Sequence, residues 1–419
     1  MRILFVTQFF WPEMRTAPMN LGALAEDLAA KGHEVLVITG VPNHPLGKVY
    51  DGYKMKLWQW EEARGFTILR LPLLPDHSQS PVRRLLNYTS FSLAASTLGI
   101  WKTRSFHPDV IFAYFAPITA GWTVRMVRAF HRAPVVYWIT DLWPENFRAS
   151  GMRIGDGTYA WLRRFEDWGY RQAQAICVDS PGYKKNLLEK GVPEDKIHVV
   201  AEWADENLFY PVERDPELGA KFGLAGKFNV IYGGNLGPVQ KLDTVIEAAR
   251  LLVDLKDVQF VFIGDGTAEQ ELKSLVVKYG LDNVRFIPRQ PMERMREFFA
   301  WADALLVHLK RTPIFELQLP SKVLAYMACG RPILNGVAGT VAEIVDQAQC
   351  GLSFPPEDAA ALADLVRKLY TMPIEQRMAM GRRGREAYLA QYSRSVQVQR
   401  LEQILQGVVA RYKSKASSF

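Results

Sequence analysis

Glycine-rich turns next to helix starts are the features of this sequence with the clearest chemistry. One turn, YGGNLG at residues 232–237, is followed by Gln240, Lys241 and a segment with helical spacing. Glycines let backbone N–H groups approach an anion, and the positive end of a helix dipole attracts it further. The pattern predicts a phosphate site at Gly234 and Asn235; glycines that only tighten the turn are the alternative.

A second candidate phosphate site begins at Ser321 and Lys322. Pro320 and Ser321 suit the first turn of a helix, which Gly330 would end. Free N–H groups there and the Lys322 ammonium would hold a diphosphate, whereas the alternative is a capped helix with a solvated lysine. A third turn, Gly264 to Gly266, lacks the third glycine of a dinucleotide fingerprint.

Acidic and imidazole side chains follow the predicted strands in the first half of the chain. Asp141 and Glu145 come after a strand that ends near residue 140, and Glu13 and His44 follow the first and second strands. Carboxyl ends of parallel strands meet at one edge of a sheet, where ligands bind. These four residues are therefore candidates for acid–base or orienting roles; a helix-capping Asp and a solvated Glu are the alternative.

Several familiar chemistries are missing from the sequence. There is no Walker A run, no G-x-S-x-G, no H-E-x-x-H and no D-x-D pair, and the seven histidines are scattered. Three widely spaced cysteines predict neither a disulfide framework nor a zinc site. We therefore expect no metal site, and the expected location is the reducing cytoplasm.

The elements that position these residues are short apolar runs alternating with helical segments, which is typical of parallel βαβ units. A weakly patterned stretch, residues 205–227, is the expected linker between two doubly wound α/β domains at 1–205 and 206–392, and residues 393–419 predict an amphipathic helix that crosses back to the first domain. The expected strands are Ile3–Val6, Val35–Ile38, Phe66–Leu71, Val110–Tyr114, Val135–Ile139, Ala175–Val178, Phe228–Tyr232, Val258–Ile263, Val284–Ile287, Ala304–His308 and Pro332–Leu334.

Charge narrows the class of partner. The 51 Lys and Arg residues exceed the 44 Asp and Glu residues by 7, which favours phosphate-bearing ligands or an anionic surface. Basic and aromatic residues alternate between Arg83 and Arg171, so a contact with the inner face of the cytoplasmic membrane is one interpretation. Core aromatics with solvated basic faces are the other. No run is long enough to span a membrane, and no nucleic-acid motif appears.

A series of short motifs resembles the GT-B glycosyltransferases of retaining family 4 over essentially the whole chain. The similarity is greatest to the branch of colanic-acid and O-antigen enzymes, some of which transfer N-acetylated deoxyaminosugars such as N-acetyl-fucosamine. The segments that carry it, in order, are FWPE at 10–13, GHEV at 32–35, PNHP at 42–45, DLWPE at 141–145, GGN at 233–235, PSK at 320–322, MACGRP at 327–332 and EIV at 343–345.

This resemblance implies a GT-B fold, two Rossmann-like domains facing a cleft. A sugar nucleotide, expected to be a UDP-sugar, would bind the second domain, and a saccharide acceptor, expected to be polyprenyl-linked, the first. Gly234, Ser321 and Lys322 would hold the diphosphate, and Arg289 and the turn at Gly264 would lie near the base and ribose. No cofactor is implied, and fixed N–H groups and lysines would replace a metal.

The chain departs from the family pattern at several positions. Asn235 stands where the family usually has an arginine, and Gln240 stands where it usually has a lysine, with Lys241 next to it. Glu316 is near the first of two family glutamates, but the second falls on an alanine, so Glu343 is the candidate for ribose. These departures leave open which side chains neutralise the phosphates.

The acceptor side departs as well. The family's catalytic-site histidine aligns with Thr140, so Asp141 is expected to make the contact to the sugar or phosphate instead. The family's Gly-Gly turn is replaced by residues 16–18, so Arg15 and Thr16 are the expected acceptor contacts. Two other function classes stay open: a GT-B UDP-sugar epimerase, which needs no acceptor, and a catalytically inactive scaffold at the membrane.

Overall fold

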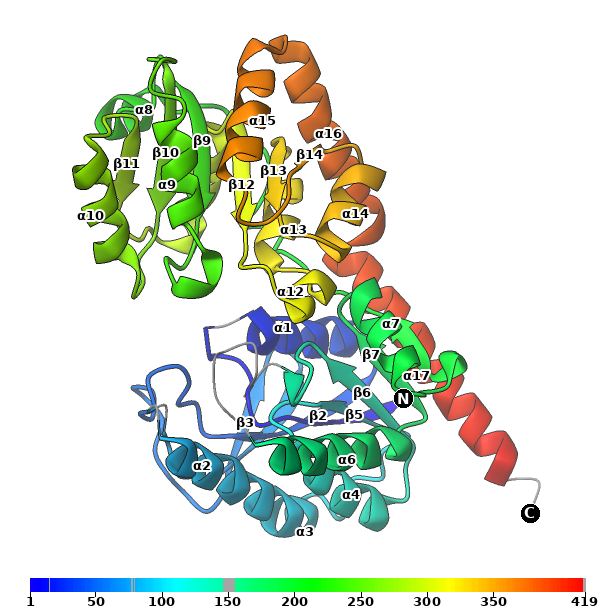
Figure 1. Cartoon of the computed structure of the whole chain (residues 1–419). Helices are drawn as coiled ribbons and strands as arrows, with labels where there is room; N and C mark the ends of the chain where they lie inside the picture. Colours follow the sequence, from blue (N-terminus) through cyan, green and yellow to red (C-terminus); the bar gives the residue numbers. More distant parts are fainter. Residues whose placement is uncertain (15, 77, 79, 146–154, 417–419) are drawn as a thin grey trace. The chain divides into compact units, whose positions relative to one another are not determined.

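The computed structural model describes the chain except residues 15, 77, 79, 146–154 and 417–419. The described residues form two compact units. The first unit combines Met1–Glu202 with the chain from Gln397 onward, and the second is Trp203–Val396. Each unit is built on a parallel sheet with helices on its faces, which confirms the predicted α/β class (Figure 1).

An eight-stranded sheet runs through the first unit. Every strand pair is parallel except that of β3 with β4. The order of the strands turns back between β1 and β5, so the switch point where open α/β sheets bind ligands lies there. In spatial order the strands are β3 (Gln59–Ala63), β4 (Phe66–Leu71), β2 (Glu34–Gly40), β1 (Arg2–Val6), β5 (Val110–Tyr114), β6 (Val135–Ile139), β7 (Ala175–Val178) and β8 (Ile197–Val199).

Helices cover both faces of this sheet, with α1 on one face and α2, α4 and α6 on the other (Figure 1). Sequence signals set their ends: Ser180 accepts a hydrogen bond from the Tyr183 N–H, 3.0 Å away, and Pro181 takes the first position of α7. The helices are α1 (Thr16–Ala30), α2 (Pro81–Ala94), the π-helix η1 (Ala95–Gly99), α3 (Ile100–Lys102), α4 (Ala120–His131), α6 (Asp156–Gln172), α7 (Pro181–Glu189), the 3₁₀-helix η2 (Glu194–Lys196) and α17 (Arg394–Ala416).

The last helix, α17, packs on the first unit. Its Glu402 carboxylate lies 2.5 Å from Lys31 Nζ and 2.9 Å from His33 Nε2. Farther along, the Tyr412 hydroxyl donates to the Arg132 carbonyl over 2.9 Å. The apolar stripe of this helix is buried, because Val398, Leu401, Leu405 and Val408 are each at most 2% exposed.

The second unit contains a six-stranded, all-parallel sheet whose strand order turns back between β9 and β12. In spatial order its strands are β11 (Val284–Ile287), β10 (Val258–Ile263), β9 (Phe228–Gly233), β12 (Ala304–His308), β13 (Ile333–Gly336) and β14 (Gly351–Ser353). Its helices are α8 (Pro216–Phe222), η3 (Pro238–Gln240), α9 (Asp243–Arg250), α10 (Glu269–Tyr279), η4 (Met292–Arg294), α11 (Met295–Ala300), α12 (Pro313–Leu317), α13 (Ser321–Ala328), α14 (Thr340–Gln347), α15 (Ala359–Thr371) and α16 (Ile374–Gln391).

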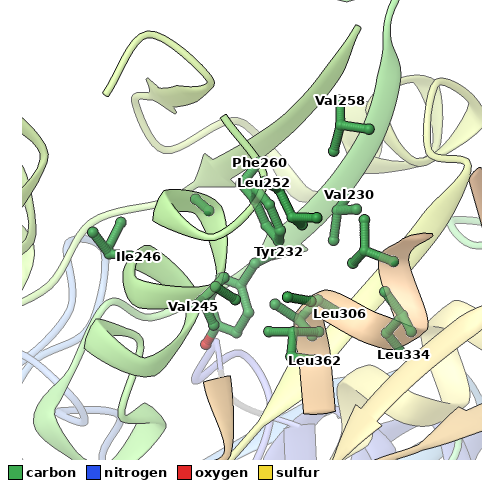
Figure 2. Packing of buried hydrophobic residues seen from close by; sticks show 14 of the residues in the cluster. Val230, Tyr232, Val245, Ile246, Leu252, Val258, Phe260, Leu306, Leu334 and Leu362 are labelled. Carbon is green, nitrogen blue, oxygen red and sulfur yellow. The ribbon is translucent and has the colours of Figure 1, made fainter. Parts of the chain in front are cut away.

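The core of the second unit places a tyrosine beside the predicted phosphate turn. Strands β9, β10, β12 and β13 and helices α9 and α15 contribute buried apolar side chains to one cluster. Figure 2 shows Tyr232, from the end of β9, packed among these residues near Val245. Because its ring is 1% exposed, its hydroxyl is held in a defined position.

Two expectations differ from the structure. Residues 216–222 of the expected linker form α8, because Asp215 caps its start and Gly223 takes the left-handed conformation at its end. Strands β3, β8 and β14 were not predicted. They are edge strands of three to five residues, so they lack the long apolar run of a strand buried on both faces.

Candidate functional site

The two glycine turns of the second unit lie against each other. A Cβ on Gly264, where φ is +148°, would lie 2.0 Å from the Gly234 carbonyl oxygen. A Cβ on Gly266 would lie 2.3 Å from the Leu236 carbonyl oxygen, and the Leu236 N–H donates to the Asp265 carbonyl over 2.8 Å. Only glycine allows this approach, so the structure joins two predicted turns into one backbone surface at the ends of β9 and β10.

Lys322 reaches this surface from the first turn of α13. Its ammonium donates to the Tyr232 hydroxyl over 2.6 Å and lies 3.9 Å from the centre of that ring. A Cβ on Gly234 would lie 3.1 Å from Lys322 Nζ. Within the described chain no carboxylate forms an ion pair with Lys322, and burial lowers its pKa to about 7. An anion at Gly234 would supply the missing counter-charge.

Tyr326 docks α13 beside the turn. Its hydroxyl accepts a hydrogen bond from the Gly233 N–H over 3.0 Å and donates to the Gly233 carbonyl over 3.3 Å. Because Lys322 and Tyr326 are four residues apart, they share one face of the helix. Sequence reasoning placed Tyr232 in the predicted turn without giving its side chain a role, and it missed Tyr326, for which the spacing from Lys322 was the available signal.

The polar residues after the first turn hold one another. The Gln240 Oε1 accepts from the Gly237 N–H at 3.1 Å and from the Asn235 Nδ2 at 3.3 Å. Lys241, with φ at +50°, pairs with Asp243 over 2.5 Å, so its charge is already partly compensated. Gln240 therefore shapes the turn, and of the two predicted lysines Lys322 has the less compensated charge.

His308, at the end of β12, contacts the backbone at the end of the same turn. It was also missed by sequence reasoning. Its Nδ1 lies 2.8 Å from the Gln240 carbonyl oxygen, and its Nε2 accepts from the Glu357 N–H over 3.0 Å. This pair of contacts fits the neutral imidazole with its proton on Nδ1. Burial lowers the pKa of His308, which keeps the ring neutral.

The other predicted donor residues are spread around the turns. Arg289 is 75% exposed, and its Nη1 lies 3.7 Å from Asp265 Oδ1 beside the second turn. Glu316 lies in α12, where a Cβ on Gly339 would lie 2.3 Å from its carbonyl oxygen. Ser321 opens α13 without a side-chain cap, and Glu343 is exposed on the first turn of α14.

In the first unit, Glu13 follows β1 and is buried against the loop that follows β2. Its Oε1 accepts from the N–H groups of Asn43 and His44, each at 2.9 Å, so the structure brings Glu13 and His44 together as predicted from strand order. Its Oε2 is buried and has no hydrogen-bond partner among the described residues. Burial raises the pKa of Glu13 to about 7, although the N–H groups and Arg70 act in the opposite direction.

The residues after β6 divide into two environments. The Glu145 carboxylate lies 2.8 Å from Lys190 Nζ and 3.3 Å from Arg163 Nη1 and is engaged in ion pairs with the neighbouring helices. Asp141 instead acts electrostatically on Asp179, the residue after β7. Burial above all, and then the negative charges of Glu202 and Asp141, raise the pKa of Asp179 well above its usual range.

Asp179 and Glu202 were not predicted, because neither belongs to a motif that points to chemistry. Thr16, a predicted acceptor contact, begins α1 and is partly buried. Arg15, the other one, lies outside the described residues. In the part of the chain that the structure describes, no cluster of three or more His, Cys, Asp or Glu has the arrangement of a metal site. None of the described helices combines the length and the apolar character needed to cross a bilayer.

Comparisons with known proteins agree with this architecture. Residues 20–203 match the family described as glycosyl transferase 4-like domain, and residues 216–387 match the glycosyl transferases group 1 family. The chain is 28% identical, over 89% of its length and 93% of the relative's, to the Escherichia coli colanic acid biosynthesis glycosyl transferase WcaI. It is 23% identical to the N-acetyl-alpha-D-glucosaminyl L-malate synthase of Bacillus anthracis, over 92% of each chain.

The fold matches a solved structure of Anabaena HepE in complex with UDP, with a TM-score of 0.70, 17% identity, and coverage of 97% of this chain and 100% of the other. The chain therefore carries a glycosyl transferase 4-like domain and a glycosyl transferases group 1 domain, the two domains of a GT-B glycosyltransferase. The protein is a glycosyltransferase, and the expected family and fold are confirmed at this level.

Proposed function

We propose that the protein transfers a sugar from a UDP-sugar to a saccharide acceptor in surface polysaccharide biosynthesis, with retention of anomeric configuration. The observation that carries the donor assignment is the Lys322 ammonium beside the Gly234 turn with no carboxylate partner among the described residues. A diphosphate would place its negative charge there. The UDP complex of the HepE neighbour and the colanic acid name of the WcaI relative support the donor and the pathway class.

The proposed mechanism relies on charge stabilisation more than on a protein nucleophile. Lys322, the N–H groups of the Gly234 turn and the start of α13 at Ser321 stabilise the departing diphosphate. The departing phosphate accepts the proton of the acceptor hydroxyl as that oxygen attacks the same face of the sugar. We propose that these groups suffice without a metal, so that turnover persists in a chelator such as EDTA.

The proposed donor sugar is an N-acetylated aminosugar. This assignment follows the resemblance to the colanic-acid and O-antigen branch, and the name of the Bacillus anthracis relative, which contains an N-acetylglucosaminyl group, supports it. Arg289 beside Asp265, and Glu316 and Glu343 near the strand ends of the same unit, are the proposed contacts for the base, sugar and ribose.

We propose that the acceptor binds the first unit at the strand ends that carry Glu13, His44 and Asp141. Glu13 is the strongest candidate for orienting the acceptor hydroxyl, because one carboxylate oxygen has no partner in the described chain. Glu145 has a supporting role, because Lys190 and Arg163 already engage its carboxylate.

A lipid-linked acceptor implies a contact with the membrane surface, and one face of the first unit suits it. Helices α2, α4 and α6 lie on the same face of the sheet (Figure 1). They expose Leu85 (56%), Trp122 (52%) and Trp161 (62%) next to arginines such as Arg84 and Arg125. Exposed aromatic rings beside cations are typical of binding to an anionic lipid surface.

The test begins with calorimetric titration of the full chain with UDP, GDP, ADP and dTDP. Selective binding of UDP that weakens in Lys322→Ala supports the donor site. Incubation of UDP-N-acetylaminosugars with short polyprenyl-diphosphate saccharides, with NMR of the product, then reads both transfer and anomeric configuration. Lys278→Ala, an exposed lysine also close to a tyrosine ring, is the matched control.

Three results would refute parts of this proposal. Equal UDP affinity in wild type and Lys322→Ala removes Lys322 from the donor site. A new sugar nucleotide formed without acceptor identifies an epimerase. Binding of UDP with no turnover on any acceptor tested favours the inactive scaffold.

A further inference from the structure

A basic cavity in the first unit is used by neither the proposed donor residues nor the proposed acceptor residues. It has a volume of about 460 Å³ and is lined by α7, β8 and α17. Its basic side chains are Lys184, His198, Arg400 and Arg411. Figure 1 shows α7 next to α17, and all these residues belong to the same compact unit.

The positive charge of this cavity is poorly compensated. The Arg400 guanidinium donates to the Val199 carbonyl over 3.2 Å, and this neutral acceptor does not offset its charge. Over the described residues, neither Arg400 nor Arg411 forms an ion pair. Lys184 does form an ion pair, at 2.9 Å from Glu194, but the Glu194 side chain is 71% exposed and therefore solvated.

His198 lies within this positive field. Its Nε2 is buried and has no hydrogen-bond partner in the described part of the chain. Burial, and then the charges of Arg411 and Lys184, lower the pKa of the imidazole, while Asp195 acts in the opposite direction. A buried polar nitrogen without a partner is rare in folded proteins and is satisfied when a ligand or water binds.

Gly407 leaves room in the cavity. It lies inside α17 and lines the cavity, and a Cβ built on it would meet no heavy atom within 4 Å. Glycine lowers the stability of a helix interior relative to alanine, and here packing against the described chain does not require it. The open space at Gly407 faces the same cavity as the uncompensated cations.

We propose that this cavity binds a phosphate-bearing anion, which joins Arg400 and Arg411 of α17 to His198 of β8 and Lys184 of α7. The anion would fasten the terminal helix to the edge strand of the sheet. Guanidinium groups favour phosphate because their fork of N–H donors matches its oxygens. The site is separate from the donor site and does not depend on the proposed transfer reaction.

The test uses the full chain with isotope-labelled histidine, so that the His198 ring signal, assigned with His198→Asn, reports locally. Inorganic phosphate is the probe. We expect a saturable change at His198 and a rise of its pKa, because an anion offsets the neighbouring cations. The double variant Arg400→Gln, Arg411→Gln should weaken phosphate binding at least about tenfold. Lys415→Gln, an exposed change on the same helix, should leave it unchanged.

Gly407→Leu provides a second variant that keeps every charge and fills the cavity, and it should also abolish the response. Vesicles of phosphatidylglycerol distinguish the source of the phosphate through the same His198 signal: a change that vesicles cause in wild type and not in Gly407→Leu identifies a lipid headgroup, whereas a response to phosphate without a response to vesicles identifies a free phosphate compound. Absence of a saturable His198 response in wild type overturns the proposal. An equal response in Gly407→Leu, shown by thermal unfolding to be folded, overturns it as well.

Discussion

Protonation of Lys322 should control how tightly the protein binds UDP. The ammonium lies beside Gly234 and its only close polar partner among the described residues is the Tyr232 hydroxyl, at 2.6 Å. Burial lowers its pKa to about 7 from the ordinary 10.5. A bound diphosphate stabilises the charged form, so the pKa rises on binding and the protein takes up a proton.

The size of the pH effect on UDP binding follows from the pKa of about 7 for Lys322 in the free protein. Only the protein with protonated Lys322 binds UDP tightly, so the Kd rises as the pH is raised above 7. The steepest possible rise is tenfold per pH unit. Between pH 7 and pH 9 the Kd for UDP should rise by about 10- to 50-fold, the upper value holding where the neutral form does not bind UDP. The terminal phosphate of UDP, with a pKa near 6, is already ionised over this range and adds little.

Two substitutions of Lys322 separate the effect of its positive charge on UDP binding from the effect of its loss of a proton. In Lys322→Arg the guanidinium stays charged at every pH used, so the Kd should become nearly independent of pH. In Lys322→Ala the lost charge-assisted hydrogen bond, worth about 1.5–3 kcal/mol, should weaken binding by about 10- to 150-fold at pH 7. The exposed Lys278→Ala should match wild type.

Calorimetry in buffers of different ionisation enthalpy measures both the Kd and the proton uptake. We expect uptake of close to one proton per UDP at pH 8 in wild type and none in Lys322→Arg. A wild-type Kd that stays within about twofold from pH 7 to pH 9 would refute the reasoning. The same pH dependence in Lys322→Arg would assign the titration to another group.

Three further predictions concern groups that support the two sites. The pKa of Glu13 is raised from 4.5 to about 7, so the free energy of unfolding should fall between these pH values by up to about 3 kcal/mol. Thermal unfolding from pH 5 to pH 8 should therefore increasingly favour Glu13→Gln over wild type, and a constant difference would contradict this. His308→Phe leaves the two backbone groups that contact His308 without these partners. It should lower the free energy of unfolding by about 2–4 kcal/mol in urea titrations and weaken UDP binding. A loss below about 1 kcal/mol would argue against this role of His308. Gly264→Ala, whose Cβ would lie 2.0 Å from a carbonyl oxygen, should cost at least about 3 kcal/mol, whereas Gly280→Ala, with nothing within 4 Å, should cost about 1; equal losses in urea titrations would be inconsistent with this steric clash.

The architecture and the positions of the glycine-rich turns could be predicted from the sequence. Buried parallel strands read as continuous apolar runs, and glycines, prolines and capping residues mark where helices start and stop. These signals are local, so Gly234, Gly264 and the start of α13 at Ser321 could be identified from neighbouring residues alone. The edge strands and α8 were not predicted, because they are too short for their apolar residues to show a strand or helix period.

Which of these residues lie together depends on how distant segments of the chain pack. Lys322 and Tyr232 are 90 positions apart, and Gln240 and His308 are 68 apart, so no local pattern relates them. The same holds for charge: Lys241 is paired with an aspartate, whereas Lys322 is partly buried without a carboxylate partner among the described residues. Pairing and burial depend on where distant segments pack, and they set the charge that each side chain can offer a ligand.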